Sequence, residues 1–229
     1  MKILILSLVF AGLASTAMAQ APGLPTGSNY TQREFTDPSF ANKLNAADAA
    51  GKGFRESANP LQQREAGELA AEAGVPCDLV DAGLVMNANR AGVRTVSYEV
   101  ACKADFGWVV TKTDGALTAY DCVALASSAK AQKGRGAKMT TCRLRTNVGS
   151  TAGLSTLTKK AGLACAPTQG AYLGGGGDPP ISRYEVMCDS GSGYIIDAPQ
   201  PRSKASLQSI TCTEAKAAGL ACSLKPGKG

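Results

Sequence analysis

The chain has 229 residues, with 24 basic and 18 acidic side chains, and 44% of its residues are hydrophobic, which suits one large folded domain or two small ones. It contains no histidine, which excludes the Ser-His-Asp and Cys-His arrangements and removes the commonest zinc ligand. Aromatic residues make up only 5%, so stacking platforms for single-stranded nucleic acid are not supplied. The sequence carries no nucleic-acid motif and no cofactor fingerprint, and we expect no cofactor.

Residues 1–19 have the three parts of a secretory signal peptide. Lys2 is the positive start, Ile3 to Ala14 form an apolar run, and Ala17-Met18-Ala19 match the A-x-A cleavage pattern. The run is shorter than the roughly 20 apolar residues that span a bilayer, which argues against the alternative of an uncleaved anchor. We therefore expect a mature chain that begins near Gln20, spans no membrane and is exported to a bacterial periplasm or secreted.

All eight cysteines follow the predicted cleavage site, and an even count in an exported chain predicts four disulfides. The alternative is two metal sites of four thiolates each, but structural zinc sites use close pairs such as C-x2-C. Here the closest two cysteines are ten residues apart. We therefore expect disulfides, and no metal, at Cys77, Cys102, Cys122, Cys142, Cys165, Cys188, Cys212 and Cys222.

The strongest internal signal is a duplication. Residues 98–110 (YEVACKADFGWVV) align without a gap with residues 184–196 (YEVMCDSGSGYII). A second motif, A-G-[VL]-x-C, ends at Cys77, Cys165 and Cys222. In this alignment the first four cysteines match the last four at offsets of 88, 86, 90 and 80. The shared order predicts one unit copied in tandem, each copy a small module stapled by its own two bridges.

The sequence pattern of each copy predicts the element order α-β-β-β-α-β. This order indicates an antiparallel sheet with helices on one face, within an α+β fold. In the first copy a helix begins after the cap Asn59, with Pro60 in its first turn, and ends at Gly74. The second copy repeats this pattern with a helix that ends before Gly162. The other predicted elements are a strand from Cys77 or Cys165, the Y-E-V-x-C strand, a strand over 108–112 or 194–197, a short helix near Cys122 or Cys212, and a last strand near Cys142 or Cys222.

A hairpin of the first two strands would place Cys77 opposite Cys102, and Cys165 opposite Cys188. Cross-strand neighbours satisfy the Cα separation of roughly 4.4–6.8 Å that a bridge needs. The remaining pairs would be Cys122 with Cys142 and Cys212 with Cys222. The last two flank a predicted helix whose two turns would hold them too far apart, so these remaining pairings stay open.

The chain divides into four segments: a signal peptide over 1–19, a flexible N-terminal arm over 20–58, the first module over 59–148 and the second over 149–229. The arm has no cysteine, no repeat and no strong periodicity, which is why we expect it to be flexible.

Two features could bind a partner. Trp108 and Tyr194 hold matched positions and would be binding anchors if exposed, although each could instead pack on its own sheet. A basic run without an acidic residue could bind an anionic polymer or surface, or it could be a solvated loop. The run consists of Lys130, Lys133, Arg135, Lys138, Arg143 and Arg145.

Three other patterns invite a catalytic or phosphate-binding interpretation. Glu99 and Glu185 recur, as paired carboxylates would, but strand alternation favours two outward-facing carboxylates in different modules. Ser127 to Lys130 matches S-x-x-K without the companion motifs of that enzyme class. The glycines at 174–177 have no following Lys-Ser or Lys-Thr and hold a turn position, so they predict a hairpin turn.

The tandem Y-E-V-x-C and A-G-x-x-C pattern over roughly residues 66–225 resembles bacterial exported proteins with paired cysteine modules, a group that brings no assigned activity. A tandem α+β pair is also similar in general build to exported β-lactamase inhibitor proteins, without a shared motif. The resemblance implies compartment and architecture only.

These observations favour an exported, disulfide-stabilised binding or inhibitor-like protein over an enzyme. The alternative is a structural envelope or surface component that binds an anionic matrix, and a hydrolase without histidine ranks third. The partner would be a protein or an anionic envelope polymer. Neither the identity of the partner nor the oligomeric state follows from the sequence.

Overall fold

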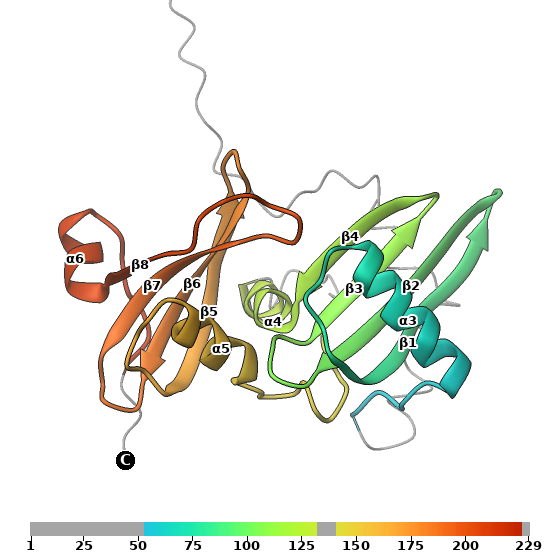
Figure 1. Cartoon of the computed structure of the whole chain (residues 1–229), viewed down its shortest axis with the longest axis horizontal. Helices are drawn as coiled ribbons and strands as arrows, with labels where there is room; N and C mark the ends of the chain where they lie inside the picture. Colours follow the sequence, from blue (N-terminus) through green and yellow to red (C-terminus); the bar gives the residue numbers. More distant parts are fainter. Residues whose placement is uncertain (1–52, 132–140, 226–229) are drawn as a thin grey trace, which may run out of the picture.

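The computed structural model describes residues 53–131 and 141–225. Two four-stranded antiparallel sheets follow one another along the chain, with strand orders β1-β2-β3-β4 and β5-β6-β7-β8 (Figure 1). Two tandem α+β modules are thus confirmed. The predicted signal peptide and most of the predicted arm lie outside the described residues.

The first module contains, in chain order, α3 (Pro60–Glu72), β1 (Leu79–Arg90), β2 (Val93–Cys102), β3 (Trp108–Thr113), β4 (Ala116–Asp121) and α4 (Cys122–Ala131). The second contains α5 (Ala152–Lys160), β5 (Pro167–Gly176), β6 (Ile181–Cys188), β7 (Gly193–Pro199), β8 (Gln208–Thr211) and α6 (Cys212–Ala217). The predicted hairpin turn between β5 and β6 is present at residues 177–180, but Gly174, Gly175 and Gly176 belong to β5 and pair with β6.

One detail of the element order differs from the prediction. The fourth strand of each module comes before the second helix, and no strand follows the last cysteine in the described part of the chain. The strand ends where a helix cap begins: an Asp121 oxygen accepts from the Ala124 N–H at 2.9 Å, and the Thr211 hydroxyl accepts from the Glu214 N–H at 3.2 Å. Between Cys142 and α5, the first module has one isolated parallel bridge, between Arg55 and Leu144.

Local signals position α3 as predicted. The Asn59 side chain accepts from the Gln62 N–H at 2.9 Å and the Gln62 side chain accepts in return, which forms a capping box. The helix ends just before Gly74, whose φ of 74° favours glycine. Ala66, Leu69 and Ala70 are buried, so this face of α3 packs against the first sheet.

All four disulfides form within modules. Cys77–Cys102 and Cys165–Cys188 form as predicted, with Cα separations of 5.0 and 5.2 Å. However, Cys77 and Cys165 lie two residues before β1 and β5, and Leu79 and Pro167 are the residues paired with Cys102 and Cys188. Cys122–Cys142 and Cys212–Cys222 close the two remaining pairs at 5.5 and 5.9 Å. The expectation that a helix would hold the last pair too far apart is wrong, because α6 is only six residues long and the chain leaves it at Gly219, where φ is 77°. Four disulfides suit a compartment outside the reducing cytosol.

The two modules share one hydrophobic core. The Phe106 ring stacks on the Tyr184 ring, with centroids 5.4 Å apart and planes 20° apart. The Tyr172 N–H on β5 donates to the Ser127 hydroxyl on α4 at 2.9 Å, so α4 satisfies a donor of β5. We call this contact between modules the joint. It is formed by residues 104–106, Asp121 and Ser127 of the first module, and by α5, Tyr172 and Tyr184 of the second.

A long connection in the second module also reaches the first. Where β3 and β4 are joined by the tight turn at Asp114 and Gly115, residues 200–207 connect β7 to β8 and extend toward α3 (Figure 1). A side chain at Gly74 would meet Arg202, which lies only 2.5 Å from the ideal Cβ position. The extra residues in this connection therefore contact the C-terminal end of α3.

Replacing Phe106 with alanine should remove the central ring of the joint. We expect the free energy of unfolding to fall by about 3–5 kcal/mol, the usual cost of truncating a buried aromatic ring. Because the core is continuous, the wild-type modules should unfold together, with Trp108 fluorescence and far-UV circular dichroism giving one denaturant midpoint. Separate midpoints in the wild type would contradict a shared core.

Candidate functional site

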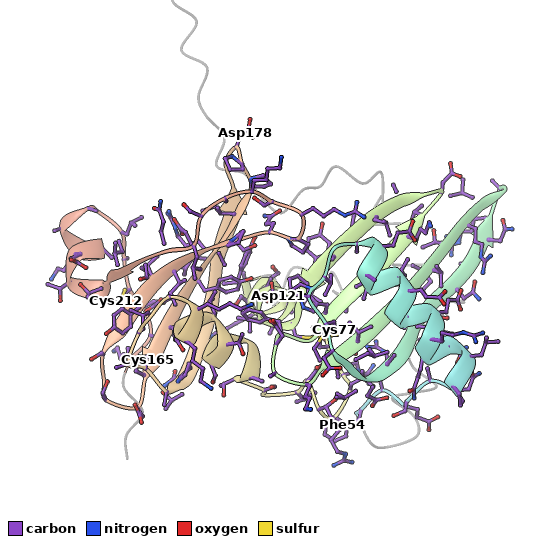
Figure 2. The ribbon with its side chains drawn as sticks, in the orientation of Figure 1. Phe54, Cys77, Asp121, Cys165, Asp178 and Cys212 are labelled. Carbon is purple, nitrogen blue, oxygen red and sulfur yellow. A yellow bond between two sulfur atoms is a disulfide. The ribbon has the colours of Figure 1, made fainter. Side chains whose placement is uncertain are left out.

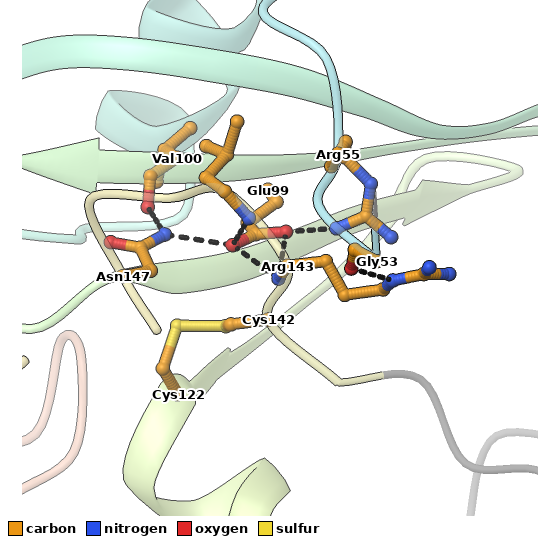
Figure 3. A network of polar contacts seen from close by, with 9 residues as sticks. Gly53, Arg55, Glu99, Val100, Cys122, Cys142, Arg143 and Asn147 are labelled. Carbon is orange, nitrogen blue, oxygen red and sulfur yellow. Dashed lines mark hydrogen bonds and ion pairs between the residues drawn. A yellow bond between two sulfur atoms is a disulfide. The ribbon is translucent and has the colours of Figure 1, made fainter. Parts of the chain in front are cut away.

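Glu99, in the Y-E-V motif of β2, is fully buried and surrounded by donors (Figure 3). Its carboxylate accepts from the backbone N–H groups of Arg143 and Leu144 at 2.8–2.9 Å and from the Asn147 side chain at 2.9 Å. The Arg55 guanidinium forms an ion pair with the same carboxylate. Arg55 lies over Gly83, where the ideal Cβ position is 2.5 Å from the arginine side chain. A glycine at this position therefore leaves the space that Arg55 fills.

The second module repeats the arrangement with fewer donors. Glu185 is fully buried and accepts from the N–H groups of Ser223 and Leu224 at 2.7 Å and from the Ser223 hydroxyl at 2.9 Å. Within the described part of the chain no arginine pairs with Glu185. The position of Gly83 is held here by Ala171, which faces Glu185 across the strand pair.

The prediction that Glu99 and Glu185 are outward-facing carboxylates is wrong. Alternation does turn both away from the face that holds the buried half-cystines Cys102 and Cys188. However, the residues after the last cysteine of each module cover the opposite face. We call residues 142–147 and 222–225 the closing segments. The two carboxylates lie in separate modules and are fully occupied by structural donors, so they do not form a general acid–base pair.

Neither carboxylate forms a metal site with the cysteines beside it. Glu99 lies near the sulfurs of Cys122 and Cys142, and Glu185 near those of Cys212 and Cys222. All four sulfurs are in disulfides, and a metal would need thiolates.

The two predicted binding aromatics are buried to different degrees. Trp108 is 7% exposed and belongs to the core, so it packs within its own module, and its indole N–H has no hydrogen-bond partner among the described residues. Tyr194 is half-buried and packs against the same core. Neither is an exposed anchor of the kind that binding through these residues would need.

The basic run is only partly described. Lys130 is exposed in the last turn of α4. Arg143 donates from Nε to the Gly53 carbonyl at 3.1 Å, and the Arg145 guanidinium lies 4.4 Å from the centre of the Phe54 ring. Both arginines thus contact the segment before α3. The remaining members, Lys133, Arg135 and Lys138, lie outside the described residues.

The serine of the S-x-x-K pattern has a structural role. Ser127 accepts from the Tyr172 N–H in the joint. Since this contact ties its oxygen to a backbone group of the other module, the interpretation as a nucleophile gains no support.

A groove of about 400 Å³ opens between α3 and the ends of β2 and β3. Four acidic and two basic side chains line it, which gives a net charge of −2. Lys112 pairs with Glu72 at 2.6 Å, and Arg94 lies 4.0 Å from Glu65. Glu68 and Asp114 form no ion pair within the described part of the chain. The lining residues are Glu65, Glu68, Leu69, Glu72, Arg94, Val96, Lys112, Asp114 and Gly115.

Sequence reasoning missed this groove, because three of its acidic side chains lie on α3 and the fourth, Asp114, lies in the distant turn between β3 and β4. The spacing of Glu65, Glu68 and Glu72 on one face of a predicted helix was a usable signal. Beneath the groove, the Tyr98 hydroxyl donates to Glu65 at 2.6 Å. Burial, together with this bond, raises the pKa of Tyr98, so its hydroxyl stays protonated.

A third buried acid, Asp121, lies between the two sheets (Figure 2). One of its oxygens caps α4, and the other accepts from the Tyr184 hydroxyl at 2.7 Å. Burial raises the pKa of Asp121 above its ordinary value, and the hydrogen bonds it accepts only partly oppose that rise. None of the interactions that shift this pKa comes from a lysine or arginine in the described residues.

Comparisons with known proteins found no match among protein-family models, curated proteins or solved structures. Within residues 53–131 and 141–225, no helix has the length and apolar character that crossing a bilayer requires.

Replacing Glu99 with glutamine should destabilise the protein more than the same change at Glu185. Glu99→Gln leaves the buried Arg55 without its counter-charge, for which we expect a loss of about 3–5 kcal/mol. Glu185→Gln weakens only hydrogen bonds to a charged group, for which we expect about 1.5–3 kcal/mol. Denaturant unfolding measures both, and Glu68→Gln on the surface is the control. Equal losses at the two buried positions would contradict this account.

Asp121 predicts a specific dependence of stability on pH. The folded protein holds its proton more tightly than the unfolded chain, so this stabilisation is complete below the ordinary value of 3.8 and is lost as the pH rises through the raised pKa. Asp121→Asn should therefore flatten the fall in unfolding free energy as the pH rises above 3.8. The chain has no histidine that would add a slope of its own at mildly acidic pH. An unchanged slope in Asp121→Asn, with exposed Asp78→Asn as control, would refute the prediction.

Proposed function

We propose that the protein is exported after cleavage near Ala19 and acts as a non-enzymatic binding protein for a protein partner. The observation that carries the proposal is the groove beside α3, a hollow with charges of both signs on a disulfide-stapled module. A rigid surface loses little conformational entropy on binding, which favours affinity and specificity.

The burial and bonding of the other polar groups support a binding role over a catalytic one. Glu99, Glu185 and Asp121 are buried and each accepts hydrogen bonds that hold the fold together. All eight cysteines are in disulfides. In the described part of the chain, no nucleophile–base pair like those of hydrolases has emerged around an open pocket.

The alternative of an envelope component held by the basic run receives less support. Of its six members, Arg143 and Arg145 contact residues 53 and 54 of the same chain. Those contacts reduce the capacity of the two arginines to bind an anionic matrix.

Affinity capture of the mature chain from its own cells tests the proposal. We expect an exported form whose mass corresponds to an N-terminus at Gln20, and one specific protein that stays bound in high salt. The same chain after reduction and alkylation is the matched control and should lose the partner with its fold. Capture of no specific protein, or release from the envelope by salt alone, would contradict the proposal and favour the matrix component.

A further inference from the structure

The duplication gives α3 and α5 equivalent faces. With the offset of 88 that relates Gly74 to Gly162, the groove residues Glu65, Glu68 and Glu72 correspond to Gly153, Thr156 and Lys160. Both helices pack on the first strands of their own sheets. The three positions therefore lie on the equivalent face of the helix in each module, with different side chains.

In the second module this face binds a loop. Residues 104–106 connect β2 to β3 in the first module and lie against α5. The Thr156 hydroxyl donates to the Ala104 carbonyl, and Lys160 Nζ lies 3.9 Å from an Asp105 oxygen. A Cβ at Gly153 would be 2.3 Å from the Phe106 ring, so only glycine lets the ring pack there.

In the first module the equivalent face is one wall of the groove. Glu68 and Glu72 are exposed, and the Glu65 side chain is 44% exposed. Leu69 and Val96, which are both largely buried, supply apolar surface at the base. The groove thus has the parts that the joint uses, which are a helix face, an apolar base and a charged residue at the end of the helix.

From this equivalence we propose that the groove beside α3 binds an exposed loop of a protein partner in the way that α5 binds residues 104–106. The inference rests on the proposed binding function and specifies the partner. The partner loop carries a lysine or arginine at the place that Asp105 holds in the joint.

The charge required of the partner loop follows from the difference between Lys160 on α5 and Glu72 at the equivalent position of α3. In the joint a cation on the helix meets an aspartate of the loop. At the same place the groove has Glu72, which pairs with Lys112, and beside it Glu68, which forms no ion pair in the described part of the chain, and the net charge of the lining is −2. A cationic loop is complementary to it, and an acidic loop is repelled.

The same charges argue against a second copy of this chain as the occupant. The loop at 104–106 carries Asp105 and is already bound in the joint. The corresponding loop of the second module, residues 189–192, carries Asp189 and no lysine or arginine. Neither of these two loops complements the groove, which disfavours a second copy that would bind through the loop used in the joint.

A photo-crosslinking side chain in place of Glu68, in the full mature chain and in its own cells, tests the inference. We expect a crosslink to a partner segment that contains lysine or arginine close to the linked residue. A crosslinker in place of Gln208, exposed on β8 of the other module, is the matched control and should not link that segment. A crosslink from position 68 to a second copy of this chain, or to a segment without a cation, would overturn the inference.

Charge exchange gives a second measurement on the same complex. Glu72→Lys should weaken binding by about threefold to tenfold, the range for one solvent-exposed ion pair turned repulsive. Replacing the crosslinked cation of the partner with glutamate should restore it, and Asp78→Lys, outside the groove, should leave affinity unchanged. A partner that is captured by affinity but crosslinks only through position 208 would refute binding at the groove, while a binding function at another surface would remain. Absence of any partner would refute both.

Discussion

A carboxylate removed from water must meet hydrogen-bond donors, or its desolvation destabilises the fold by several kcal/mol. Both copies of the Y-E-V motif place such a carboxylate in the middle of their sheet, at Glu99 and Glu185. The donors common to both are backbone N–H groups directly after the last cysteine of each module. The second disulfide of each module holds that closing segment beside its sheet. Carboxylate, closing segment and disulfide therefore form one structural unit, which accounts for the recurrence of the glutamate.

The sequence was informative wherever the cause of the structure is local. Local residues determine where α3 begins and ends. Asn59 caps its first turn, which contains Pro60, and Gly74 adopts the positive φ that follows its last turn. The hairpin bridges followed from strand pairing, since Cys77 lies just before β1 and Cys102 ends the adjacent β2. In each case the interacting residues are close in sequence or are linked by a simple repeat.

The candidate site was less predictable, because its decisive contacts join residues that are distant in sequence. Alternation correctly showed which way Glu99 points, but not that residues 44 and 45 positions later would cover it. The cap formed by Asp121 is a local feature, whereas its bond to Tyr184 spans 63 positions and depends on how the modules pack. The groove likewise forms only after α3 is placed on its sheet.

The two modules also differ at positions whose surroundings differ. Ser97 and Thr111 share a hydrogen bond on the first sheet, and the corresponding Arg183 and Asp197 form an ion pair on the second. Ser97 is 2% exposed, whereas the Arg183 side chain is 36% exposed, so the charged pair has replaced the neutral one where water can reach it.

The same reasoning applies to Asp121, whose counterpart in the second module is Thr211. Each caps the helix that follows, and the threonine does so without a charge. A carboxylate is therefore unnecessary for the cap, and its extra oxygen is the one that binds Tyr184 across the joint. The shared glutamates thus hold each module together, whereas Asp121, Gly153 and Lys160, which the modules do not share, join one module to the other with the shared Tyr184. The acidic face of α3 likewise has no counterpart on α5, which is the reason to look for function there.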